Sequence, residues 1–262
     1  FNFSYMFQYN DINIYDEGER AYNTTYKYHL AEFGFSDVWY KNLRFGLGLR
    51  FEYYKYKDFL FKKPELIGLD VESEHFLSYF ATFDKGYFPS KGTEFKAAYS
   101  LYTDNMAQYN DHAPFSALSG SWASVVPVTR RFSIIPSIYG RVLIGKDIAY
   151  PLQNAIGGEV YGLYIPQQLP FAGVTNMELM DNSIMIASVK LRQRMGSIHY
   201  LTLTGNYGLT DSHFFEILKG KQLFSISAGY GMDSIFGPLE ITFGYSNQTD
   251  KGSCYVNLGY YF

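Results

Sequence analysis

The amino-acid sequence predicts an all-β protein, a transmembrane antiparallel β-barrel of about twelve strands, formed as one domain by residues 1–262. Apolar and polar residues alternate with a period of two along most of the chain, as in strands with one apolar and one polar face. Aromatic residues make up 19% of the chain, with 26 Tyr and 23 Phe, and would supply the aromatic girdles of such a barrel. No run of about 18 apolar residues occurs, which excludes a spanning helix.

The composition agrees with a barrel and argues against other classes. The mean hydropathy is only −0.16, because lipid-facing and lumen-facing residues of a barrel strand cancel on average. A net charge of −3 without a basic block gives no indication of nucleic-acid binding. The single Cys254 permits no internal disulfide. Residues 1–5 lack the pattern of a signal peptide, so we expect the export signal to have been cleaved or to lie upstream.

The first four predicted strands are 1–10, 21–35, 41–57 and 73–84, each near the length that a tilted spanning strand needs. The alternation is clearest in the third strand. One of its faces consists of Phe45, Leu47, Leu49, Phe51 and Tyr53. The other face consists of Gly46, Gly48, Arg50, Glu52 and Tyr54. Strict alternation of this kind indicates a strand with two different environments.

The next three predicted strands are 93–103, 115–128 and 131–145, and residues 94–102 show the same alternation. Residues 129–130 join the last two of these strands in a short turn. Elsewhere the connections are longer. Short turns that alternate with longer connections are typical of the periplasmic turns and extracellular loops of outer-membrane barrels.

The last five predicted strands are 182–194, 198–208, 221–232, 237–247 and 252–262. Residues 185–194, 200–207 and 238–245 alternate, as does the terminal strand. One face of that strand consists of Cys254, Val256, Leu258, Tyr260 and Phe262. The chain therefore ends on an aromatic residue at an apolar face.

A soluble β-sandwich or a lipocalin-like barrel is the alternative fold. Such proteins bury one face of each strand and seldom keep aromatic residues on the other. The polar faces also carry many charges, which a dry core would not tolerate unpaired. These charges fit a wet lumen or a paired network within one; they are Arg50, Glu52, Glu94, Lys96, Arg141, Lys190, Arg192 and Arg194.

A turn between two predicted strands resembles a motif of the BamA/TamA superfamily of outer-membrane assembly and translocation barrels. That motif reads D-x-x-x-F-P-x-x-G, and the matching residues here are Asp84, Phe88, Pro89 and Gly92. A tight turn explains the spacing, because Pro89 fixes φ and Gly92 permits positive φ.

The longest connection, 146–181, is similar to the superfamily's long sixth extracellular loop, which starts with Gly-Gly and folds back into the lumen. The residues that carry this resemblance are Gly157, Gly158, Gly162, Leu163 and Tyr164. Five predicted strands follow the loop, as in the sixteen-stranded family, and seven precede it, where the family has eleven. The chain is accordingly either a complete twelve-stranded barrel or the last twelve of sixteen strands.

Two departures from the family pattern bear on this loop. Aligned on Gly157 and Gly158, Leu163 stands where the family has a loop Arg, and Leu203 stands where its acidic partner would lie. A buried Arg without its acid would be costly, so the joint loss is physically consistent. We expect the loop to pack in the lumen through apolar and Tyr contacts, with Leu163 inside rather than in solvent.

The resemblance implies a location in the outer membrane of a Gram-negative bacterium. Its partners would be outer-membrane lipids and the barrel assembly machinery, which would read Leu258, Tyr260 and Phe262 as an assembly signal. Residues 162–171 look most similar to barrels fused behind patatin-like phospholipase domains in Bacteroidetes-type bacteria. We therefore expect a barrel that anchors a larger, patatin-like protein with a periplasmic or surface domain and provides a translocation route. The alternatives are a self-contained pore or channel, a BamA-like assembly factor and, less favoured, a lipolytic barrel.

No catalytic, cofactor-binding or metal-binding residues are predicted in this chain. A lipolytic barrel would need His-x-Ser on one strand face, and none of the five histidines has it; His75 and Ser78 would face opposite ways. No G-x-S-x-G motif occurs, so a phospholipase domain would lie outside the chain. Residues 211–218 are expected to form a short capped helical turn in a loop.

Overall fold

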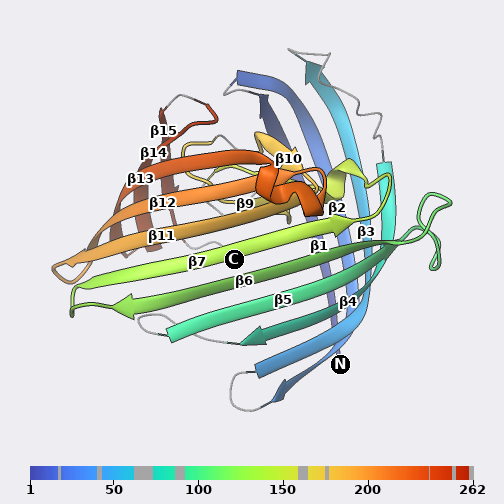
Figure 1. The fold of residues 1–262 in the computed structure, drawn as a ribbon, viewed down its shortest axis with the longest axis horizontal. Helices are drawn as coiled ribbons and strands as arrows, with labels where there is room; N and C mark the ends of the chain where they lie inside the picture. The colour runs from blue at the N-terminus through green and yellow to red at the C-terminus, as the bar shows by residue number, and fades with distance from the viewer. Residues whose placement is uncertain are drawn as a thin grey trace.

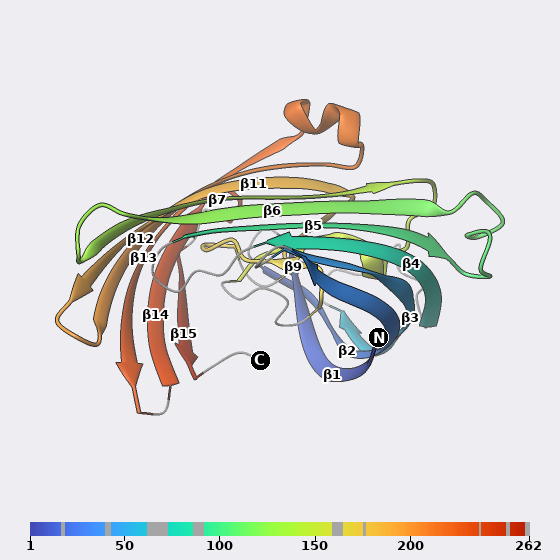
Figure 2. The same ribbon diagram turned by 90° about the horizontal axis from the view of Figure 1, so that it is seen from below.

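The computed structural model describes residues 1–16, 19–39, 43–61, 73–85, 92–158, 165–174, 177–235, 237–249 and 252–259. Within these ranges, twelve strands form one antiparallel sheet in the order β1-β2-β3-β4-β5-β6-β7-β11-β12-β13-β14-β15. Each strand pairs with the next in the chain, except that β7 pairs with β11 across the long connection. The sheet curls into a trough with β1 at one edge and β15 at the other (Figure 1; Figure 2).

The strands of the sheet correspond one by one to the twelve predicted segments. Their bounds are β1 Asn2–Asp16, β2 Glu19–Trp39, β3 Leu43–Phe61, β4 Ser73–Lys85, β5 Gly92–Thr103, β6 Phe115–Pro127, β7 Phe132–Ile144, β11 Ser183–Met195, β12 His199–Asp211, β13 Lys221–Ser234, β14 Gly237–Ser246 and β15 Gly252–Leu258. The prediction of an antiparallel barrel sheet with twelve strands is confirmed. Among the residues that the structure describes, no helix is long and apolar enough to cross a membrane.

The first three strands are longer than predicted, and this is a correction. β1 continues beyond residue 10 to Asp16, and β2 and β3 are extended in the same way. The polar residues there break the apolar alternation but still pair across the hairpin. Thr25 Oγ1 donates to Asp11 Oδ1 at 2.9 Å, and Asn23 Nδ2 donates to Asn13 Oδ1 at 3.0 Å. Cross-strand polar pairs can replace apolar ones in holding a hairpin together.

The two faces of the sheet differ as the alternation predicts. In β3, Leu47, Leu49 and Phe51 are exposed on the outer face, whereas Glu52 is buried on the inner one. In β15, Leu258 is 64% exposed and shares its outer face with Val256. Tyr260 and Phe262 lie outside the described residues, so their part of the assembly signal stays a prediction. The structure describes no pairing between β1 and β15 within its ranges, and closure of the wall by these two strands also stays a prediction.

The predicted turn motif is described only at its ends. Asp84 lies near the end of β4, opposite Lys96 of β5, and Gly92 begins β5 with a φ of 141°. The positive φ at Gly92 confirms the reason given for a glycine there. Phe88 and Pro89 lie outside the described residues.

Candidate functional site in the lumen

The long connection between β7 and β11 folds into the concave side of the sheet (Figure 2). It contains the 3₁₀ turn η2 Tyr150–Leu152 and three short strands, β8 Asn154–Ile156, β9 Gln168–Leu169 and β10 Leu179–Asp181. These three strands form a second small sheet in the order β10-β8-β9. The prediction that a long loop folds toward the lumen is confirmed. We call its described residues, 146–158, 165–174 and 177–181, the lumen loop.

The Gly-Gly motif shapes the exit from β8. Gly157 has a φ of 144° and Gly158 a φ of 75°, a region that favours glycine. Their amides donate hydrogen bonds to the carbonyl oxygens of Leu169 and Val174 at 3.0 and 2.8 Å. The two glycines thus let the backbone reverse and bind its own returning segment. Gly162, Leu163 and Tyr164 lie outside the described residues, so the predicted position of Leu163 is not tested.

A polar contact fixes the start of the lumen loop to the wall. Arg141, on the inner face of β7, is only 8% exposed. Its Nη1 donates to the carbonyl oxygen of Leu152 and to Asn154 Oδ1, both at 2.9 Å. Asn154 Nδ2 in turn donates to the carbonyl oxygens of Asp181 and Asn182 at 3.2 and 3.1 Å. Asn154 therefore joins the wall to both ends of the loop.

A second contact reaches the opposite part of the wall. Gln167 Nε2 donates to Tyr54 Oη at 3.2 Å, and Tyr54 Oη donates to Glu52 Oε2 at 2.6 Å. Glu52 lies 3.9 Å from Arg50, which forms a closer ion pair with Glu32 at 2.8 Å. Buried charges are tolerated when they are paired and hydrogen-bonded in this way. Arg50, Glu32 and Glu52 thus form a paired network of the kind that the sequence allowed.

Apolar packing fills the space between these contacts. Ile156, Leu169, Phe171 and Val174 of the loop are almost fully buried. They pack against wall residues that share one cluster with them, namely Ile184, Ile186, Leu223 and the partly buried Tyr139. A second cluster joins the loop to the inner aromatic residues of the first strands. It includes Tyr26, Tyr28, Tyr54, Phe76, Tyr102, Phe115, Leu152, Ala155, Ile165 and Met177.

On its other side the loop touches the backbone of β14. Gly173 has a φ of 90°, and a Cβ built there would lie 2.4 Å from the carbonyl carbon of Tyr245. A Cβ on Gly244 would lie 2.6 Å from the amide nitrogen of Gly173. Tyr255 Oη of β15 donates to the carbonyl oxygen of Val174 at 2.7 Å. The loop therefore contacts strands from both halves of the sheet.

These contacts confirm one part of the predicted attachment and correct another. Apolar and Tyr contacts do hold the loop, and among the described residues no ion pair joins the loop to a strand of the wall. However, Arg141 adds charge-assisted hydrogen bonds that the prediction did not include. The sequence identifies Arg141 as a lumenal charge but gives no signal for its partner, because only the folded loop brings Asn154 to it.

The predicted role of Leu203 is wrong. Leu203 is 44% exposed and lies on the outer face of β12, together with Leu201. Thr202 and Thr204 are the half-buried, inward-facing residues around it. Successive residues of a strand face opposite sides, so the match to the motif does not place Leu203 in the lumen. The inner positions are threonines, so no carboxylate stands there either.

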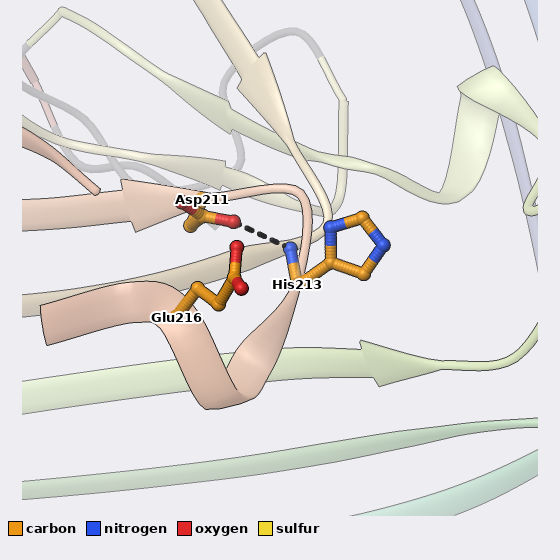
Figure 3. Close-up of side chains that lie close together, drawn as sticks. All are labelled: Asp211, His213 and Glu216. Atoms are coloured by element: carbon orange, nitrogen blue, oxygen red, sulfur yellow. Dashed lines mark hydrogen bonds between the residues drawn. The ribbon is translucent and has the colours of Figure 1, made fainter. Parts of the chain in front are cut away.

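The residues that could carry other chemistry lie apart or at the surface. His75 is exposed and Ser78 is fully buried, which confirms that they face opposite ways. Near the loop between β12 and β13, Asp211, His213 and Glu216 have possible ligand atoms within 4.8 Å of one another (Figure 3). Asp211 Oδ1 already accepts a hydrogen bond from the His213 amide at 2.7 Å, and His213 Nδ1 lies 3.0 Å from Ser212 Oγ.

These hydrogen bonds hold the entry to the 3₁₀ helix η3 Phe214–Lys219. The predicted short helical turn is thus confirmed at this place. The predicted side-chain cap is wrong: His213 directly precedes the helix and makes no side-chain cap hydrogen bond. Asp211 lies three residues before Phe214 and binds the amide of His213 instead. A structural role therefore explains Asp211 and the proximity of its neighbours.

Comparisons with known proteins agree with this geometry. A family model described as the OMP85 superfamily matches residues 1–262. The crystal structure of BamA from Haemophilus ducreyi lacking POTRA domains 1–3 has a TM-score of 0.60 and 12% identity, over 98% of this chain and 57% of that chain. CdiB from Escherichia coli has a TM-score of 0.62 and 14% identity, over 98% of this chain and 49% of that chain. The chain thus spans about half the length of these structures, whose likeness shows the fold. Among proteins with curated functions, no match is found.

Proposed function

Since the chain belongs to the OMP85 superfamily, we propose that it is an outer-membrane β-barrel that anchors a larger protein and contains a translocation route closed by its own lumen loop. The observation that carries this proposal is the attachment of the loop to both halves of the wall, through Arg141 on one side and Gly173 on the other. A plug held at several points closes a lumen at rest, and release of a few contacts would open it.

The surface of the sheet supports a location in the outer membrane. Large apolar side chains are exposed on the outer face of strand after strand, for example Leu49, Leu118, Ile138, Leu203 and Phe243. A contiguous apolar surface of this extent is unfavourable in water and favourable in lipid. The lipids of the outer membrane are therefore proposed partners, together with the assembly machinery that would recognise Leu258, Tyr260 and Phe262.

The proposed larger protein is patatin-like, with a phospholipase domain outside this chain. Support comes from the resemblance of residues 162–171 to patatin-linked barrels. On this proposal the chain itself performs no catalysis and needs no cofactor. Reading the parent reading frame upstream of Phe1 tests it: a patatin-type G-x-S-x-G segment is expected, and a signal peptide directly before Phe1 would refute the fusion.

Conductance in planar lipid bilayers tests the plugged route. We expect the reconstituted protein to insert and to show a low conductance with rare openings, because the lumen loop obstructs the lumen. A steadily open channel of high conductance would instead favour a self-contained pore. Failure to insert under conditions in which another outer-membrane barrel inserts would refute the membrane proposal itself.

A further inference from the structure

Below the lumen loop, toward the short turns of the sheet, lies a cavity of about 670 Å³. Its lining includes five basic side chains, Arg130, Arg131, Lys190, Arg192 and Arg194, and two acidic ones, Asp233 and Glu240. We call this cavity the basic vestibule. A second cavity of about 560 Å³, which Pro170 and Ala172 of the loop also line, adjoins it at Lys190, Arg192 and Glu240.

Among the residues that the structure describes, no carboxylate oxygen lies within 4.0 Å of any of the five cations of the basic vestibule. Of the two acids, Asp233 accepts a hydrogen bond from Tyr200 Oη at 3.1 Å. The arginines deeper in the lumen differ, since Arg50 pairs with Glu32 and Arg141 binds Asn154. Five cations against two acids leave an excess of positive charge in a partly enclosed space, which attracts anions.

The spacing of these cations is regular. Lys190, Arg192 and Arg194 occupy alternate positions of β11 and line the same cavity. Alternate residues of a strand are roughly 7 Å apart along its axis, so the three charges form a ladder of about that spacing. Arg131 lies beside the end of this row, because its carbonyl oxygen accepts a hydrogen bond from the Arg194 amide at 2.7 Å.

We propose that the basic vestibule binds an acidic polypeptide segment in an extended conformation. An extended chain with acidic residues at every second position has the same spacing of roughly 7 Å as the ladder on β11. A single phosphate group would contact one or two of the cations and leave the rest uncompensated. The two adjoining cavities, which share Lys190, Arg192 and Glu240, also offer more room than a compact anion needs. This proposal rests on the proposed function, because the short turns of an outer-membrane barrel, and with them the vestibule, would face the periplasm.

Fluorescence anisotropy with the whole chain in detergent micelles tests this binding. The probe is a labelled peptide of about ten residues in which Glu and Ser alternate, long enough to span the ladder. We expect saturable binding that weakens as salt is added, because the attraction is electrostatic. A peptide in which Lys and Ser alternate should not bind. Inorganic phosphate should compete only at far higher concentration than the Glu peptide.

Two charge-removing variants locate the site. The double variant Lys190→Gln with Arg192→Gln, and separately Arg130→Gln with Arg131→Gln, should each raise the Kd for the Glu peptide by about tenfold. The matched control removes two cations at the other end of the sheet, Lys219→Gln with Lys221→Gln, and should leave the Kd within about twofold. Circular dichroism of each variant checks that the sheet is formed. If the variant of Lys190 and Arg192 in β11 does not fold, the variant of Arg130 and Arg131 in the turn still tests the proposal.

Three results would overturn the vestibule proposal. The first is equal binding of the Lys and Glu peptides, and the second is an unchanged Kd for the Glu peptide in both vestibule variants. The third is competition by inorganic phosphate at a concentration that supplies no more negative charge than the Glu peptide does, which would indicate a simple anion site. The outcome is separable from that of the proposed function. A chain that inserts into bilayers but does not bind the Glu peptide refutes only the vestibule, whereas a chain that binds but never inserts refutes only the membrane proposal.

Discussion

Arg141 and Asn154 bind each other in both directions across the boundary between wall and loop. Arg141 Nη1 donates to Asn154 Oδ1 at 2.9 Å, and Asn154 Nδ2 donates back to the carbonyl oxygen of Arg141 at 3.3 Å. Asn154 is fully buried, so no solvent replaces a lost partner. This pair is the polar centre of the attachment, and its removal is the most direct way to loosen the lumen loop.

Asn154→Ala should release the start of the loop. The substitution removes the Asn154 acceptor of the Arg141 guanidinium and the donor to the carbonyl oxygens of Asp181 and Asn182 at the end of the loop. Loss of these buried, charge-assisted hydrogen bonds should cost about 2–4 kcal/mol of stability. We expect faster protease cleavage within 146–181 and more frequent channel openings in planar bilayers. Lys219→Ala, at an exposed position, is the control. Unchanged cleavage and conductance in Asn154→Ala would show that the pair does not hold the loop.

Gly173→Ala should displace the loop from β14. The added Cβ would stand 2.4 Å from the carbonyl carbon of Tyr245, and the φ of 90° adds strain for any residue with a side chain. Gly196→Ala separates the two effects, because Gly196 has a φ of 69° with nothing within 4 Å. Only about 1–2 kcal/mol of backbone strain is expected there. A thermal unfolding midpoint that falls equally in both variants would argue against close packing at Gly173.

Burial raises the pKa of Asp181, although Thr210 Oγ1 donates to its Oδ2 at 2.5 Å. The docked loop therefore binds the proton more tightly than the free loop does. Between the ordinary pKa of 3.8 and the raised value, rising pH weakens docking, and the stability of the docked loop is greatest below this window. Protease protection of residues 146–181 in vesicles should decrease as pH rises through the window. Asp181→Asn should remove this pH dependence, and a variant that retains it in full would show that another group is responsible.

The sequence predicts the strands well because a period-two pattern is a local property. In β3 and β15 the exposed and inward residues are those that the alternation assigns. The ends of β1 and β2 were underestimated because Asp11 and Asn13 interrupt the apolar pattern while their cross-strand bonds preserve the pairing. Pairing depends on the partner strand, which a scan along one strand does not include.

The attachment of the lumen loop could be predicted only as a general packing of the loop in the lumen. Gln167 and Tyr54 are 113 residues apart, and Tyr255 and Val174 are 81 residues apart, so no local pattern connects them. Gly157 and Gly158 could be found from the sequence because both have a positive φ, which favours glycine whatever the rest of the fold. Gly173 gives no such motif, since its need for glycine comes from the backbone of β14 and not from its neighbours in the chain.

Leu203 and Thr204 are adjacent in β12 and face opposite environments, so one substitution at each position tests both the register and the membrane proposal. Leu203→Lys places a charge on the outer face, where a lysine near the middle of a bilayer costs about 2–4 kcal/mol. Thr204→Lys places the same charge in the inner cavity that Asn206 and Glu240 also line. It would stand opposite Lys190 there, and such a like-charge pair costs only about 0.2–1 kcal/mol. We expect folding into lipid vesicles to be impaired by Leu203→Lys and nearly normal for Thr204→Lys. In detergent the difference should shrink, because micelles adapt around a charge on the outer face. The opposite order of the two variants would mean that the faces are assigned the wrong way round, and an equal, small effect of both in vesicles would mean that β12 does not face lipid.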